Sequence, residues 1–95
     1  MTDLQCPATA VLLDDACPPP SWTARLRVAE RFTVRGAEPL MSLVDDSADL
    51  FRGETFVVAA PAADVEEALR RRGVGGRAPV VVAVDSTGWQ PVPAP

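Results

Sequence analysis

The chain of 95 residues lacks histidine, lysine and tyrosine altogether. Without histidine there is no Ser-His-Asp triad and no Cys-His catalytic pair, and without lysine there is no Schiff-base chemistry. The absence of lysine also excludes the Gly-x-x-x-x-Gly-Lys-Ser/Thr loop that binds nucleotide phosphates in GTPases. We therefore expect a protein that is not an enzyme and that carries no cofactor.

Cysteine is scarce, with only Cys6 and Cys17 present. Two cysteines are too few for a disulfide scaffold, and without histidine they are too few for a four-ligand zinc site. The acidic cluster at 45–49 lacks the glycine and the terminal glutamate of a calcium-binding loop. We therefore predict no metal site. We expect reduced thiols, although the sequence leaves open whether the two cysteines are bonded.

Long apolar runs and positive net charge are also missing. The longest apolar stretch, 56–63, is far shorter than the ~18 residues that indicate a membrane span. No basic region followed by an apolar run marks a signal peptide at the N-terminus. The net charge of −4 argues against general binding to DNA or to anionic membranes. We expect an acidic, cytoplasmic protein.

Apolar residues make up 47% of the chain and charged residues 23%, which is typical of a globular domain. A chain of this length forms one domain, and we place its core at about 9–90. Residues 1–5 and 91–95 are predicted to be flexible tails, because alternating prolines favour an extended and poorly packed C-terminus.

The clearest pattern is an alternation of apolar and polar residues from Trp22 to Val34. It predicts one half-buried antiparallel strand with the even-numbered residues inward. Glu30 interrupts the apolar face, and a bulge at Ala29–Glu30 would turn it outward. The polar face carries a row of arginines. These are Arg25, Arg27, Arg31 and Arg35.

One helix is predicted over 64–72, with Asp64 as its N-cap and Gly73 just beyond its end. Val65, Ala68 and Leu69 share its apolar face. With the other predicted strands, the chain would have five or six strands and one short helix. This tally favours a mostly β fold, a small antiparallel β-barrel with one short helix. The other strands are expected at 10–13, 40–44, 55–60 and 79–84, with turns at 45–49, 52–54 and 85–88.

Residues 26–36 also carry an ordered pattern of an apolar pair, an acidic residue, a phenylalanine, a valine and a glycine. The members are Leu26, Val28, Glu30, Phe32, Val34 and Gly36. This pattern resembles the opening of the second, β-barrel domain of translational GTPases, such as elongation factor Tu. The strand at 40–44, the Gly53-Glu54 step and the segments 68–76 and 80–84 follow in the order of that family.

The resemblance covers about residues 22–88 and implies a stand-alone barrel, separated from its GTPase and linked to translation. Two departures limit it. The turn glycine of the family is replaced here by Asp45, Asp46 and Ser47. The pocket with which the family's barrel helps to hold the aminoacylated end of tRNA does not match residue by residue, so that activity is not carried over.

The arginine row and Trp89 are the candidate binding residues. Guanidinium groups at Arg25, Arg27, Arg31 and Arg35 could bind phosphates or carboxylates of a partner. Alternatively, the row is a solvated strand face whose arginines pair with acidic residues on neighbouring strands. Trp89 follows a turn, and we expect it to be exposed and to anchor a partner.

We therefore predict a non-catalytic binding module with a protein partner. The alternative is a module that binds an RNA end or a nucleotide through the arginine row, and a steep loss of affinity with salt would distinguish it. A third hypothesis is a small-molecule carrier or an enzyme that uses carboxylates inside a barrel mouth. The sequence leaves the oligomeric state and the identity of the partner open.

Overall fold

The structure is a computed structural model, and it describes residues 6–94. Within this range the chain forms five strands, two α-helices and one short 3-10 helix. In chain order they are β1 (Ala8–Asp14), η2 (Ser21–Arg25), β2 (Val28–Thr33), α1 (Ala37–Leu50), β3 (Thr55–Ala60), α2 (Ala62–Arg71), β4 (Val80–Asp85) and β5 (Gly88–Val92).

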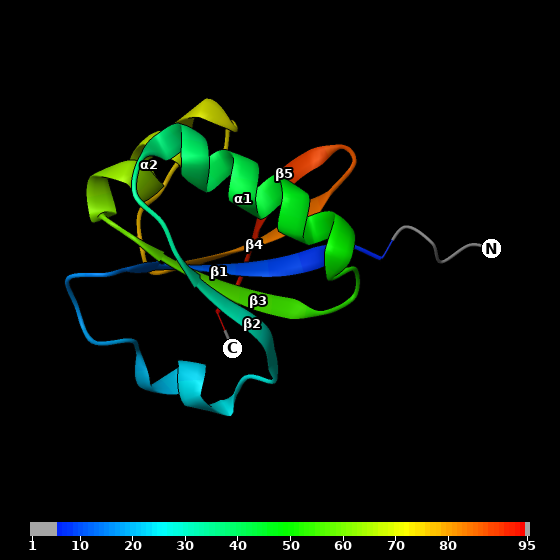
Figure 1. The fold of residues 1–95 in the computed structure, drawn as a ribbon, viewed down its shortest axis with the longest axis horizontal. Helices are drawn as coiled ribbons and strands as arrows, with labels where there is room; N and C mark the ends of the chain where they lie inside the picture. The colour runs from blue at the N-terminus through cyan, green and yellow to red at the C-terminus, as the bar shows by residue number, and fades with distance from the viewer. Residues whose placement is uncertain (1–5, 95) are drawn as a thin grey trace.

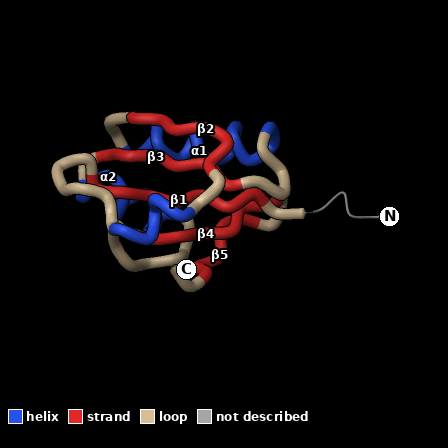
Figure 2. The backbone as a smooth tube through the Cα atoms, turned by 90° about the horizontal axis from the view of Figure 1, so that it is seen from below, coloured by secondary structure: helices blue, strands red, loops and turns tan. Residues whose placement is uncertain are grey.

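The five strands form one open, mixed sheet in the order β2-β3-β1-β4-β5. The pairs β1–β3 and β2–β3 are parallel, whereas β4 runs antiparallel to both β1 and β5. Figure 2 shows β2 and β5 at the two edges of the sheet. The predicted closed antiparallel barrel is therefore not formed. Parallel neighbours need long crossover connections, and helices supply them here.

The central strand β1 is buried on both faces of the sheet. Ala10, Val11 and Leu12 have no exposed surface, and neither do Phe56 and Val58 of the neighbouring strand β3. A strand covered on both sides is apolar along its whole length and does not alternate. This explains why the unbroken apolar runs at 10–13, 56–60 and 80–84 form the three interior strands of the sheet, while the alternating segment forms an edge.

Both α-helices cover the same face of the sheet (Figure 1). The main core lies between them and the strands, and Phe56 is its largest fully buried side chain. The ring of Phe56 lies edge-on to Phe32 of β2, with 6.2 Å between centroids, and 5.9 Å from the ring of Phe51 at the end of α1. These aromatic contacts fix β2 and α1 to the centre of the sheet.

The opposite face of the sheet is covered by the connection between β1 and β2, which includes η2 (Figure 1). Trp22 and Leu26 of this connection are half-buried. They pack against a second, smaller group of buried residues. That group consists of Val11, Leu13, Val57 and Val81.

The predicted strand at 40–44 and the predicted turn at 45–49 are wrong, because both belong to the helix α1. Leu40, Val44 and Ala48 recur every four residues and are buried on one helix face. Pro39 does not oppose this helix, since it lies in the first turn, where a missing N–H leaves no intrahelical bond unmade. A short apolar run fits both a strand and a helix, and here the helical period prevails.

The segment from Trp22 to Val34 is not one strand, because η2 and an extended connection precede β2. The predicted bulge is confirmed, since the register between β2 and β3 shifts between Val28 and Glu30. Glu30 is exposed, as the bulge requires. The predicted strand at 55–60 is also confirmed.

The predicted helix at 64–72 is confirmed as α2, with Val65, Ala68 and Leu69 buried. It is not the main helix, because α1 has 14 residues and α2 has 10. Asp64 is not its N-cap, which is Pro61. Instead, the Asp64 carboxylate accepts a hydrogen bond from the N–H of Gly36 at 2.8 Å. This bond joins the first turns of the two helices.

The C-terminal strand β5 was not among the predicted strands. Pro91 and Val92 pair with β4, opposite Val82 and Val81, so the predicted tail begins two residues later than 91. The predicted tail at 1–5 and the last residue, Pro95, lie outside the described residues.

The first prediction concerns the centre of the main core. Replacing Phe56 by alanine should lower the free energy of unfolding by about 3–5 kcal/mol, because it leaves a cavity where three aromatic rings meet. Urea denaturation measures this. The control is Leu50→Ala, at a side chain that is 76% exposed, which should change stability by less than about 0.5 kcal/mol. Equal effects of the two variants would contradict the packing described above.

Candidate functional site

The four arginines predicted as a row lie on and beside the edge strand β2. Arg25 ends η2, Arg27 precedes β2, Arg31 lies on β2 and Arg35 follows it. All four are exposed. Within residues 6–94, none of their side chains forms a hydrogen bond or an ion pair. The alternative in which they pair with acidic residues on neighbouring strands is thus not realised there. We call these four residues the arginine surface.

The arginines on the helical side of the molecule behave differently, because they pair with carboxylates. Arg71 bonds to Glu67 at 2.7 Å and contacts Glu38 of α1 at 3.3 Å. Arg77, in the loop before β4, forms no ion pair either, so four of the five arginines without an ion pair within residues 6–94 lie around β2, although the chain as a whole is acidic. The remaining pairs are Arg52–Asp49, Arg70–Glu67 and Arg72–Asp45.

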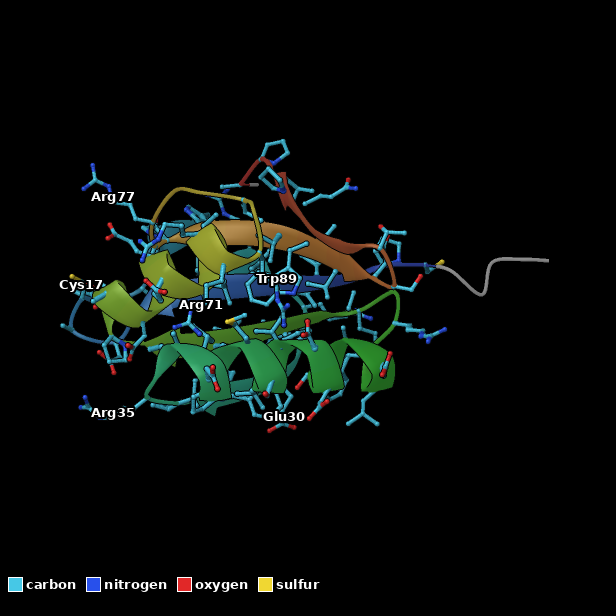
Figure 3. All side chains as sticks on the ribbon, turned by 90° about the horizontal axis from the view of Figure 1, so that it is seen from above. Cys17, Glu30, Arg35, Arg71, Arg77 and Trp89 are labelled. Carbon is cyan, nitrogen blue, oxygen red and sulfur yellow. The ribbon has the colours of Figure 1, made fainter. Side chains whose placement is uncertain are left out.

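A groove of about 650 Å³ opens where the parallel strands β1, β2 and β3 end. Ligand sites of open α/β sheets lie at this edge, outside the carboxyl ends of the parallel strands. Thr33 of β2 and Ala59 of β3 line the groove, together with the loop that follows β1. Arg35 lines it as well, so the groove continues the arginine surface. Figure 3 shows Arg35, Cys17 and Arg77 at the same end of the molecule.

The loop beside this groove is organised by Asp14. Its carboxylate accepts hydrogen bonds from the N–H of Ala16 at 2.9 Å and from the thiol of Cys17 at 3.5 Å. The hydrogen bond to Asp14 and the negative charge of that residue raise the pKa of the Cys17 thiol. A raised pKa keeps the sulfur protonated and makes it a poor nucleophile. Cys6 and Cys17 are both free and exposed.

A second cavity, of about 370 Å³, lies between α1 and the β4–β5 hairpin. Asp45 of α1 connects two other residues that line this cavity, Arg72 and Trp89. It accepts a hydrogen bond from the indole N–H of Trp89 at 2.8 Å and pairs with Arg72, whose guanidinium carbon lies 5.5 Å from the centre of the Trp89 ring. This group combines a hydrogen bond, an ion pair and a cation–π contact. It joins both helices to the last strand.

The other charged groups around the second cavity also have partners. Asp49 pairs with Arg52 at 3.5 Å. Asp85 accepts hydrogen bonds from the hydroxyl and the N–H of Thr87, at 2.6 and 2.8 Å, and these bonds lower the pKa of its carboxyl. Because the charged side chains around this cavity already have partners within the protein, few polar groups there are available to bind a ligand. We interpret it as a structural contact.

The expectation that Trp89 is exposed is wrong, because its side chain is only 6% exposed. Trp89 pairs with Val84 across the hairpin, which turns its ring toward the helices, where Asp45 and Arg72 hold it. Figure 3 shows the ring between the two helical segments. The Trp89 side chain therefore stabilises the fold and is not accessible to a partner.

The part of the chain that the structure describes contains no group of three side chains able to hold a metal ion. Neither of its α-helices has the length and hydrophobicity needed to cross a membrane. Comparison with protein-family models, with curated proteins and with solved structures finds no match for this chain.

The second prediction tests the contact between α1 and the hairpin. Replacing Asp45 by alanine should lower the free energy of unfolding by about 1–3 kcal/mol, because the indole N–H of buried Trp89 loses its partner. The matched control is Asp46→Ala, which removes the same charge from an exposed neighbouring position. Thermal or urea denaturation compares the two. A control as destabilised as Asp45→Ala would show that charge, and not the contact, is responsible.

The third prediction uses the raised pKa of Cys17. In a Cys6→Ser background, Asp14→Asn should speed the alkylation of Cys17 by iodoacetamide at mildly alkaline pH. Removing the charge of Asp14 lowers the thiol pKa, so more thiolate is present at a given pH. The rate as a function of pH should therefore shift to lower pH. Asp15→Asn is the control, and an unchanged profile in Asp14→Asn would refute the role of Asp14.

Proposed function

We propose that this chain is a non-catalytic binding module that docks on an acidic protein partner through the arginine surface. The observation that supports this is the division among its arginines. Four arginines beside the helices pair with carboxylates of the same chain, whereas the four around β2 form no ion pair within residues 6–94. Arg77, in the loop before β4, forms none either, so β2 has four of the five arginines without an ion pair in that range. Unpaired guanidinium groups keep their capacity for bidentate bonds to carboxylates.

Such a surface acts locally. The net charge of −4 repels anions at long range, but at physiological salt a charge is felt over only about 8 Å. A partner that reaches the arginine surface therefore responds to the four guanidinium groups more than to the rest of the molecule. Exposed ion pairs contribute about 0–1 kcal/mol each, so specific binding needs several of these arginines together.

A protein partner fits this surface better than a nucleic acid. Glu30 is exposed on β2, and Asp14 and Asp15 line the groove next to Arg35. A nucleic acid carries a charge at every nucleotide and would meet these carboxylates, whereas a protein can place its acidic residues opposite arginines alone. An RNA end or a nucleotide remains the alternative, because unpaired guanidinium groups also suit phosphate. The link to translation rests on the sequence resemblance alone.

The fourth prediction tests the arginine surface by charge reversal. Arg31→Glu should abolish the capture of protein partners from a lysate, while Arg77→Glu, which makes the same charge change at an exposed loop position, should not. Capture is measured by mass spectrometry with and without nuclease. Equal capture by both variants would refute the proposal. Loss of every partner on nuclease treatment, with a steep salt dependence, would favour RNA instead.

A further inference from the structure

The outer side of β2 is an open strand edge. β2 is the last strand of the sheet order and pairs with β3 alone (Figure 2). A strand edge presents a row of N–H and C=O groups that can pair with another extended chain. The arginine surface lies along this edge, so main-chain groups and unpaired positive charges occur together there.

The register identifies which main-chain groups face outward. The N–H of Val34 bonds to the carbonyl of Ala59 at 3.0 Å, and Thr33 is paired in register with Ala59. Bonded residues alternate along a parallel strand. Phe32 and Val34 therefore direct their main chain to β3, whereas Arg31 and Thr33 direct theirs outward. By this alternation the N–H groups of Arg31 and Thr33 face away from β3, on the side of β2 where no further strand pairs within residues 6–94.

The opposite edge of the sheet differs in chemistry. β5 contains Pro91, and Pro93 follows it. Proline cannot donate a main-chain hydrogen bond and discourages further strand pairing. β2 has no proline between Val28 and Thr33. Only β2 therefore combines an open edge with an uninterrupted set of donors.

The charge of β2 selects what can pair with it. A second copy of this chain pairing through β2 would bring two arginine surfaces together, with one carboxylate on each strand, Glu30, to offset them. Like charges on adjacent strands are destabilising. An extended segment with acidic side chains meets complementary charge instead. Arg31 shares the sheet face of Val57, its register partner on β3. Because side chains alternate along a strand, carboxylates at every second position of the segment would lie on this face.

We propose that the acidic partner binds as an extended segment that adds a sixth strand to the sheet beside β2. Its main chain bonds to Arg31 and Thr33, its alternate carboxylates face the arginine surface, and one end of it enters the groove lined by Thr33 and Arg35. This mode of binding rests on the proposed function, since it needs the arginine surface. Main-chain bonds supply affinity, and the alternating charges supply specificity.

The fifth prediction separates strand addition from attraction by charge. Thr33→Pro removes an outward N–H and leaves every arginine in place, and proline is tolerated where the N–H of an edge strand faces solvent. Thr33→Val keeps the N–H and is the matched control. The probe is a fluorescein-labelled peptide of alternating glutamate and threonine, titrated by fluorescence anisotropy. We expect binding by Thr33→Val as by the unaltered chain, and binding weakened about tenfold or more by Thr33→Pro.

A second probe carries the same charges but has every main-chain nitrogen methylated, so that it cannot donate main-chain hydrogen bonds. We expect it to bind at least about tenfold more weakly, and we expect the unmethylated peptide to slow hydrogen exchange at Arg31 and Thr33. Circular dichroism confirms that the variants are folded. Equal binding of both peptides and of both Thr33 variants would overturn strand addition and leave the arginine surface as a charge-only site. No binding of either peptide to the unaltered chain would overturn both proposals.

Discussion

The position of β1 between a parallel and an antiparallel neighbour is the constraint on which the rest of the fold depends. β1 pairs with β3 on one side and with β4 on the other, and its central residues are fully buried. Parallel strands require crossover connections, so α1 crosses the sheet between the parallel strands β2 and β3. α2 lies over the same face because it carries the chain from β3 past β1 to β4, and the two helices supply the main core. The connection through η2 covers the other face. The strands left for the edges are β2 and β5, with opposite consequences for binding.

The same topology separates two populations of charge. On the helical side, α1 and α2 place acidic and basic residues opposite one another, and the network of Asp45, Arg72 and Trp89 ties both helices to the hairpin. No carboxylate within residues 6–94 forms an ion pair with the arginines around β2, although Asp14 and Asp15 line the same groove as Arg35. The arginines there remain unpaired because of where β2 lies in the sheet, and not because the chain is short of acidic residues. The candidate site is therefore a consequence of strand order.

The sequence predicted individual elements well where local signals are strong. The strand at 55–60 lies between a glycine turn and a proline, and α2 has an acidic start, a basic end and Gly73 in the left-handed region after it, at φ +75°. The prediction from the sequence failed at α1, because residues 40–44 are as apolar as a buried strand. Only the recurrence of an apolar residue at Ala48, four positions after Val44, indicates a helix. The alternation predicted the exposure of Arg31 on β2. It failed before that strand, because Thr23 is buried and Ala24 exposed in η2, against the predicted register. The burial of Trp89 was not predictable, since its partner Asp45 is 44 positions away and no local pattern records that contact.

Protection of a strand edge and binding at a strand edge use different chemistry, and the proposed binding mode assigns one of them to each edge of this sheet. Prolines on β5 oppose pairing with any chain, whatever its charge. Arginines beside β2 oppose pairing only with chains of the same charge, including a second copy of this one, because the main-chain donors of Arg31 and Thr33 remain in place. Proline residues, or a balanced mixture of both charges, would protect a strand edge against pairing with any chain. The charge beside β2 is mainly positive on an otherwise acidic protein, with Glu30 as the one carboxylate of the strand. Such charge is selective, and under the proposed binding mode this selectivity admits a strand of the opposite charge.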